Sequence, residues 1–73
     1  MVSNQDVWRI ADLLQHAVRL LEKAGIETPQ TDAELLLAHC LSLSRTELYL
    51  RSDEFIGQSA AGNCLAMLQR RLK

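Results

Sequence analysis

Hydrophobic residues recur along the first third of the chain in alternating steps of three and four. This spacing places them on one face of an α-helix, with charged residues mostly on the other face. The pattern predicts a helix from about Asp6 to Ala24, capped by Ser3 or Asn4 and ended by Gly25 in a left-handed conformation. The hydrophobic stripe consists of Val7, Ile10, Leu14, Ala17, Leu21 and Ala24, with Trp8 expected at its edge.

Two helix starts are predicted within residues 28–50. Thr31 with Glu34, and Ser44 with Glu47, have the spacing of a capping box. In a capping box the first side chain accepts a hydrogen bond from a free backbone N–H of the first turn, and the Glu side chain accepts one from the capping residue. The second predicted helix therefore follows Thr31, and the third follows Ser44.

The remaining pattern completes a helical bundle. The second helix is expected from about Asp32 to Leu41 and, being apolar nearly all round, to be the most buried of the set. A short third helix, Arg45 to Leu50, precedes a last helix that starts near Gln58 and contains Gly62, either a close contact or a weak point. No segment alternates with a period of two, so the fold class is all-α, with four to five mostly antiparallel helices. A fifth helix would arise if the first helix breaks or if Phe55-Ile56 starts a short turn.

Length and charge set limits on what the chain can be. Its 73 residues make one domain or part of a larger protein. The last helix runs to the final residues without Gly or Pro after it, so we expect a piece of a longer chain. The net charge is −1, which offers no overall field for nucleic acid or an anionic membrane.

The two cysteines and the N-terminus indicate the compartment. Cys40 and Cys64 lie within apolar helical patterns and are interpreted as buried free thiols, with a disulfide as the alternative. Charged residues interrupt any apolar leader, and no apolar run approaches the roughly 20 residues of a membrane span. We therefore expect a cytoplasmic protein.

Catalytic and metal-binding chemistry is weakly represented. The three glycines are scattered, so the sequence contains no phosphate-binding loop. His16 and His39 have no second metal ligand at helical spacing. Asp32 and Glu34 are interpreted as residues of a helix start rather than as an acid–base pair. We predict no catalytic residue, no metal site and no cofactor-binding residue in this chain.

Charged edges remain as candidate binding surfaces. One surrounds the short third helix, a second is the arginine pair of the last helix, and a third combines Trp8, Arg9 and His16. The alternative for each is an ordinary solvated face. The predicted partner-binding residues are Arg45, Glu47, Arg51, Arg70 and Arg71.

Five sequence motifs resemble one known family. They are an I-x-x-L-L-x-x-A-x-x-x-L helix, a Gly-Ile-x-Thr-Pro connection, a D-A-E-L-L-L-A-H helix, a Leu-Ser-Arg-x-x-Leu turn and a final Arg-Arg. Together they resemble the N-terminal domain of the HemK/PrmC-type release factor glutamine methyltransferases. The matching positions are Ile10, Leu13, Leu14, Ala17, Leu21, Gly25, Ile26, Thr28, Pro29, residues 32–39, Leu43, Ser44, Arg45, Leu48, Arg70 and Arg71.

The resemblance implies a role and assigns the chemistry to another domain. Residues 1–73 would be a helical substrate-recognition domain that helps to bind and orient peptide chain release factors. S-adenosylmethionine and an Asn-Pro-Pro-Tyr motif would belong to a catalytic domain that this chain lacks, so the chain alone is expected to be inert. Its expected partners are release factors and that catalytic domain, with no membrane and no direct nucleic-acid contact.

Two other function classes stay open at this point. A nearly all-apolar second helix is typical of an oligomerisation or protein-interaction module, so the isolated chain would self-associate. The spacing of the second and third helices also permits a helix-turn-helix nucleic-acid binder, although SRTELYLR has few basic residues.

Overall fold

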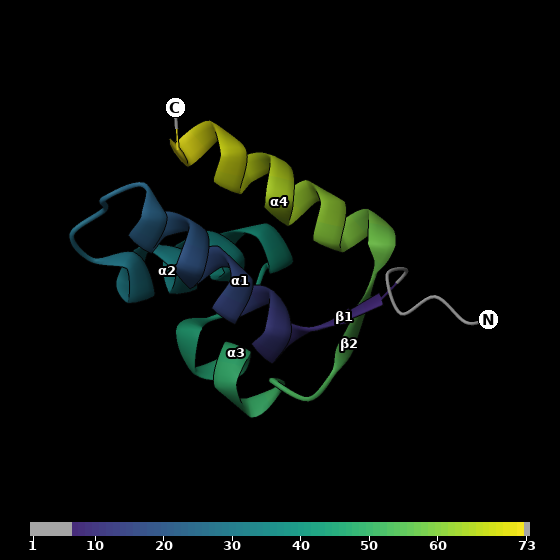
Figure 1. The fold of residues 1–73 in the computed structure, drawn as a ribbon. Coiled ribbons are helices and arrows are strands. Elements are labelled where there is room, and N and C mark those ends of the chain that lie inside the picture. The colour runs from purple at the N-terminus through teal and green to yellow at the C-terminus, as the bar shows by residue number, and fades with distance from the viewer. Residues whose placement is uncertain (1–6, 73) are drawn as a thin grey trace.

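A computed structural model describes residues 7–72. Within this range the chain forms four α-helices and two short strands, as Figure 1 shows. The all-α fold class is thereby confirmed, with one addition, the strand pair. The elements are β1 (Val7–Arg9), α1 (Ile10–Lys23), α2 (Pro29–Leu41), α3 (Arg45–Leu50), β2 (Phe55–Gly57) and α4 (Gln58–Leu72).

Helices α1 and α2 form the centre of the fold, because each of them packs against the other three helices. One core of leucine, alanine, isoleucine and cysteine side chains joins these helices. The fully buried large side chains are Leu13, Leu21, Leu37, Leu48, Leu68 and Cys64. The prediction that α2 is the most buried helix was nevertheless wrong, since α1 buries five residues and α2 four, and Leu35 of α2 is 52% exposed. Gly62 marks no close contact, because a Cβ there would meet nothing within 4 Å.

The strand pair was not predicted. β1 and β2 are antiparallel, with Trp8 opposite Ile56 and Arg9 opposite Phe55, and they lie at the opposite end of α4 from the C-terminus (Figure 1). Strands of three residues are too short to produce a period-two pattern. Phe55-Ile56 therefore belongs to a strand and does not start the short turn that was one alternative for a fifth helix.

Helix α1 begins later than predicted because its first N–H groups find partners far along the chain. The N–H of Ile10 donates to the carbonyl of Glu54 and that of Ala11 to Ser52, both at 3.0 Å. Free N–H groups of a first turn need such acceptors, and Arg9 supplies no side-chain cap. The predicted caps Ser3 and Asn4 lie outside the described residues.

The ends of α1 and α3 confirm the local predictions. Gly25 follows α1 with φ 82°, and the N–H of Ile26 donates to Leu21 across the turn. The capping box of α3 is complete, because Ser44 Oγ accepts from the Glu47 N–H at 3.0 Å and Glu47 Oε1 accepts from the Ser44 N–H at 2.9 Å.

The predicted box at Thr31 and Glu34 was wrong. Pro29 occupies the first turn of α2 and Thr28 the capping position, so Thr31 lies inside the helix. Proline suits the first turn because its missing N–H would have no partner there. Glu34 is thereby released from capping and turns toward α3.

We predict that Ser44 and Thr31 contribute differently to the free energy of unfolding. Ser44→Ala should lower the free energy of unfolding by about 1 kcal/mol, because an N–H of α3 loses its acceptor. Thr31→Ala, the matched control, should change the stability by less than about 0.5 kcal/mol, since Thr31 is exposed and caps nothing. Urea denaturation followed by circular dichroism measures both. Equal losses would show that the capping position of α2 is Thr31 after all.

Candidate functional site

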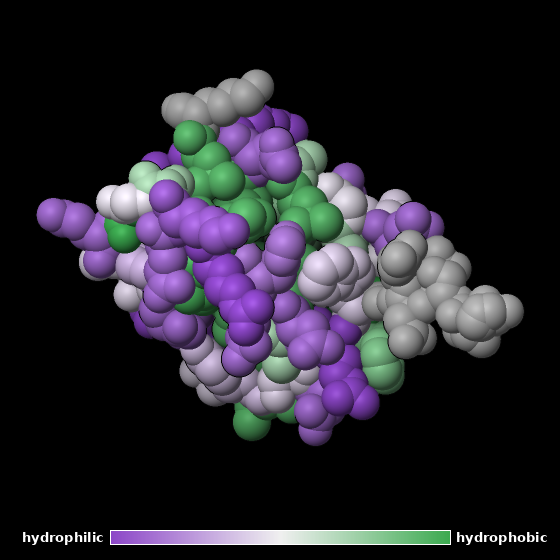
Figure 2. Space-filling model, in the orientation of Figure 1, coloured by the Kyte–Doolittle hydropathy of each residue, from purple (hydrophilic) through white to green (hydrophobic). Residues whose placement is uncertain are grey.

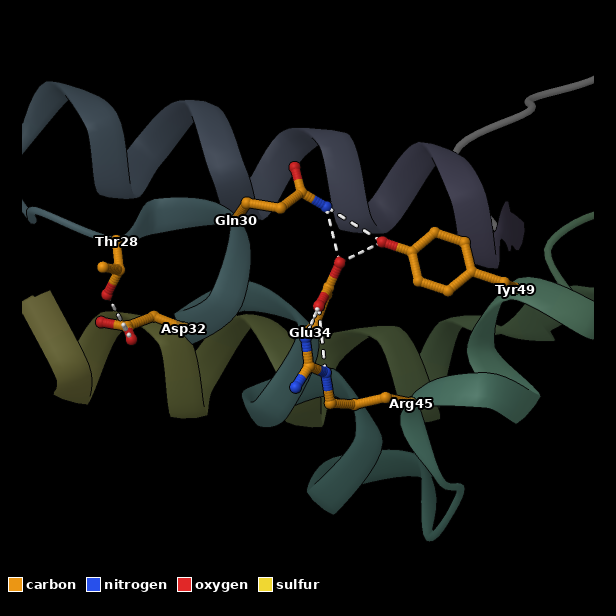
Figure 3. Close-up of polar contacts among 6 residues, drawn as sticks. All are labelled: Thr28, Gln30, Asp32, Glu34, Arg45 and Tyr49. Atoms are coloured by element: carbon orange, nitrogen blue, oxygen red, sulfur yellow. Dashed lines mark hydrogen bonds and ion pairs between the residues drawn. The ribbon is translucent and has the colours of Figure 1, made fainter.

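Glu34 is the centre of a polar network between α2 and α3 (Figure 3). Its side chain comes from α2 and is 5% exposed, the one charged residue buried in the described core. Arg45 of α3 contacts Glu34 Oε1 through Nη2 at 2.7 Å and through Nε at 3.1 Å. Gln30 Nε2 donates to Glu34 Oε2 at 2.9 Å, and the Tyr49 hydroxyl donates to the same oxygen.

These contacts determine the ionisation of the network. The hydrogen bond from Tyr49, then that from Gln30, lowers the pKa of Glu34 to about 2, with Arg45 contributing and burial opposing. The bond to the Glu34 carboxylate raises the pKa of Tyr49. A carboxylate held ionised by three donors is a structural acceptor, not a general acid near neutral pH. Glu34 therefore joins α3 to α2, which agrees with a structural role.

Only part of the predicted binding set lies free on the surface. Arg45 is paired with Glu34 and Glu47 caps α3, so both stabilise the fold. Arg51 ends α3 with an exposed side chain. Sequence reasoning missed Tyr49, because it lies 15 positions from Glu34, and it missed Gln30 although a spacing of four from Glu34 is a helical pairing signal.

The last two predicted residues lie at a different place, on α4. Arg71 Nη2 contacts Asp32 Oδ2 at 2.9 Å, which links α4 to the first turn of α2. The Thr28 hydroxyl also donates to Asp32 at 3.2 Å. Arg70 is exposed and lines a groove between α2 and α4. The five predicted residues thus divide between two separate surfaces.

The third predicted surface, Trp8 with Arg9 and His16, is also separated into two parts. The rings of Trp8 and His16 lie 5.4 Å apart, and Trp8 is half-buried at the core edge as predicted. Arg9 turns away from them, and its guanidinium carbon lies 5.1 Å from the centre of the Phe55 ring. Trp8, Arg9 and His16 therefore do not form one binding cluster.

The cysteines are free thiols, as predicted. Cys64 is buried on α4 and Cys40 is half-buried on α2. Burial, and next the contact with Cys40, raises the pKa of Cys64 to about 12, so this thiol stays protonated. Within residues 7–72, no group of three or more His, Cys, Asp or Glu side chains could hold a metal ion. That same range contains no helix long and apolar enough to span a membrane.

Comparison with known proteins decides the family. Residues 12–73 match the family model of the PrmC N-terminal domain. The chain belongs to this family.

Relatives of this PrmC N-terminal domain carry the name release factor glutamine methyltransferase. One from Deinococcus radiodurans is 41% identical over 86% of this chain and 23% of its own length. One from Moorella thermoacetica is 40% identical over 80% of this chain and 20% of its own length. The chain thus spans about a fifth of the curated relatives it matches. No solved structure matches it.

The described residues of this PrmC N-terminal domain do not fit S-adenosylmethionine. S-adenosylmethionine is a nucleoside derivative, and nucleotide sites of the Rossmann type place a Gly-rich turn at the start of a helix. Gly25 follows α1, Gly57 ends β2 and Gly62 lies inside α4, so they form no such turn. The hollow of about 480 Å³ between α1 and α3 is lined by Leu14 and Leu48 together with polar residues such as Gln15 and Gln30.

Proposed function

We propose that this chain is the substrate-holding domain of an S-adenosylmethionine-dependent protein glutamine methyltransferase, and that its partner is a peptide chain release factor. The family match over residues 12–73 carries this proposal. The relatives named for that activity support the reaction and the partner. A cytoplasmic location is part of the same proposal.

The contribution of such a domain to catalysis is positioning. A helical domain with its own core can hold the release factor while another domain transfers the methyl group. Fixing one glutamine side chain in a reactive pose removes part of the entropic barrier, although this domain touches no reacting atom. Two ion pairs join α2 to α3 and to α4 within this domain.

Direct binding tests the proposal. The chain, labelled with a fluorophore at its N-terminus, is titrated with the unmethylated release factor of the same organism, and fluorescence anisotropy is measured. We expect saturable binding that weakens with added salt, because charged edges contribute to it. A folded chain, verified by circular dichroism, without saturable binding would contradict the proposal.

Self-association is the second candidate function, and exposed hydrophobic side chains favour it. Figure 2 shows hydrophobic surface gathered along α4 between hydrophilic side chains. Two exposed hydrophobic side chains lie on other elements, Leu50 on α3 (79% exposed) and Phe55 on β2 (59% exposed). Exposed apolar patches mark protein–protein contacts. Sedimentation velocity at several concentrations separates the two functions, because a substrate-holding domain stays monomeric without its partner.

A further inference from the structure

The seam between α2 and α4 contains a groove that the polar network of Glu34 does not use. One part, of about 510 Å³, has apolar walls formed by Leu35, Leu36 and Met67. A second part continues from it, since both are lined by His39, Met67 and Arg70. Cys40, Asn63 and Ala66 line only this second part. The groove thus follows both helices over several turns.

Leu35 is the apolar anchor of this groove. It is 52% exposed, whereas Leu37 on the same helix is 1% exposed. Because the core of the described chain is completed without Leu35, burying its side chain against a partner would gain free energy that the isolated domain does not have.

The charge at the rim is positive. Asp32 is the one carboxylate among the lining residues, and Arg71 already neutralises it. Arg70 is exposed and makes no ion pair among residues 7–72. The groove therefore offers an apolar floor beside an uncompensated guanidinium group, which is complementary to an apolar side chain flanked by carboxylates.

We propose that the α2–α4 groove docks an amphipathic helix with acidic flanks from the release factor. This rests on the proposed function for the identity of the partner. A groove with two helices as walls accepts a helix whose apolar face enters between them. A strand would instead need a free sheet edge, and the β1–β2 pair contributes no residue to the groove. Leu35 and Met67 contact the apolar face, and Arg70 binds a carboxylate.

Two groove variants with matched controls test this docking. Leu35→Ser and Arg70→Glu change the groove, while Leu50→Ser and Arg19→Glu make the same replacements at exposed positions of α3 and α1. Binding of each chain to unmethylated release factor is measured by anisotropy, with circular dichroism to verify folding. We expect each groove variant to weaken binding at least about tenfold and each control to stay within about twofold, as for anchor and rim residues of an interface.

Cys40 provides a second readout that needs no substitution. It lines the groove and is half-buried, whereas Cys64 is buried and serves as internal reference. Bound release factor should slow the alkylation of Cys40 by N-ethylmaleimide. Mass spectrometry of the tryptic peptides measures the extent of alkylation.

The outcomes separate this inference from the proposed function. If the groove variants and the controls bind the release factor as tightly as the unchanged chain, and Cys40 is still alkylated, the docking proposal is overturned. The proposed function would then still stand. Absence of binding by the unchanged chain would overturn both. Loss of self-association, and not of release factor binding, in Leu35→Ser would assign the groove to a second copy of the chain and overturn the proposal.

Discussion

Leu37→Ala should destabilise the domain by about 3 kcal/mol, within the usual range of 2–5 kcal/mol for a buried leucine. Leu37 is 1% exposed on α2, which packs against the other three helices. Its loss removes apolar burial and leaves a cavity. A domain of this size is stable by only about 4–11 kcal/mol, so the variant loses a large part of the total.

Thermal and urea denaturation followed by circular dichroism measure this loss. A change of about 3 kcal/mol corresponds to a fall in Tm of more than about 10 °C for a domain of this length. Leu35→Ala is the matched control on the same helix, and since Leu35 is half-exposed we expect it to cost less than about 1 kcal/mol. Equal losses at the two positions would contradict the orientation of α2.

Glu34→Gln should have the second largest effect, about 2 kcal/mol at pH 7. The substitution keeps the shape of the side chain and removes the charge that Tyr49, Gln30 and Arg45 bind. The shift of the Glu34 pKa from 4.5 to about 2 corresponds to roughly 3 kcal/mol. The expected loss is smaller, because Arg45 is 53% exposed and water screens part of its attraction.

The same shift predicts how the effect depends on pH. Above pH 4.5 the Glu34 carboxyl is ionised in both the folded and the unfolded chain, so its full stabilisation is present. Between pH 4.5 and about 2 the unfolded chain takes up the proton first, and the stabilisation is lost as the pH falls. The difference between the unchanged chain and Glu34→Gln should therefore shrink toward zero near pH 2.

Urea denaturation at several pH values between 7 and 2 tests this dependence. Glu27→Gln is the control, since Glu27 is exposed in the connection between α1 and α2. It should leave both the stability and its pH dependence unchanged within about 0.5 kcal/mol. A constant difference between the Glu34 variant and the unchanged chain down to pH 2 would show that the charge of Glu34 is not what stabilises the network.

The candidate surfaces show where sequence reasoning ends. Arg70 and Arg71 were predicted as a pair on the last helix. The structure places both beside one groove, but only Arg71 forms an ion pair there. Arg71 is occupied by Asp32, 39 positions earlier in the chain. Arg45, which was predicted for a partner, pairs with Glu34 inside the domain and keeps a half-exposed side chain, so its partner contact stays a prediction. No spacing within the sequence reveals these pairs, because each joins two helices whose faces meet only on packing.

Features within one or two helical turns were determined by the sequence alone. The bounds of α3, its capping box at Ser44 and Glu47, and the left-handed turn at Gly25 depend on residues that are neighbours in the chain. Hydrophobic periodicity likewise determined the all-α class. These features agree between sequence and structure because their hydrogen bonds close within a few residues.

Tertiary packing alone decided where α1 starts, which side of α2 is covered and which charges remain free. Helix α1 begins at Ile10 because carbonyls of residues 52 and 54 accept its first N–H groups. A helix that is apolar nearly all round has no periodic signal for its buried side. The packing of α1, α3 and α4 on α2 covers Leu37 and leaves Leu35 exposed, and that choice creates the groove.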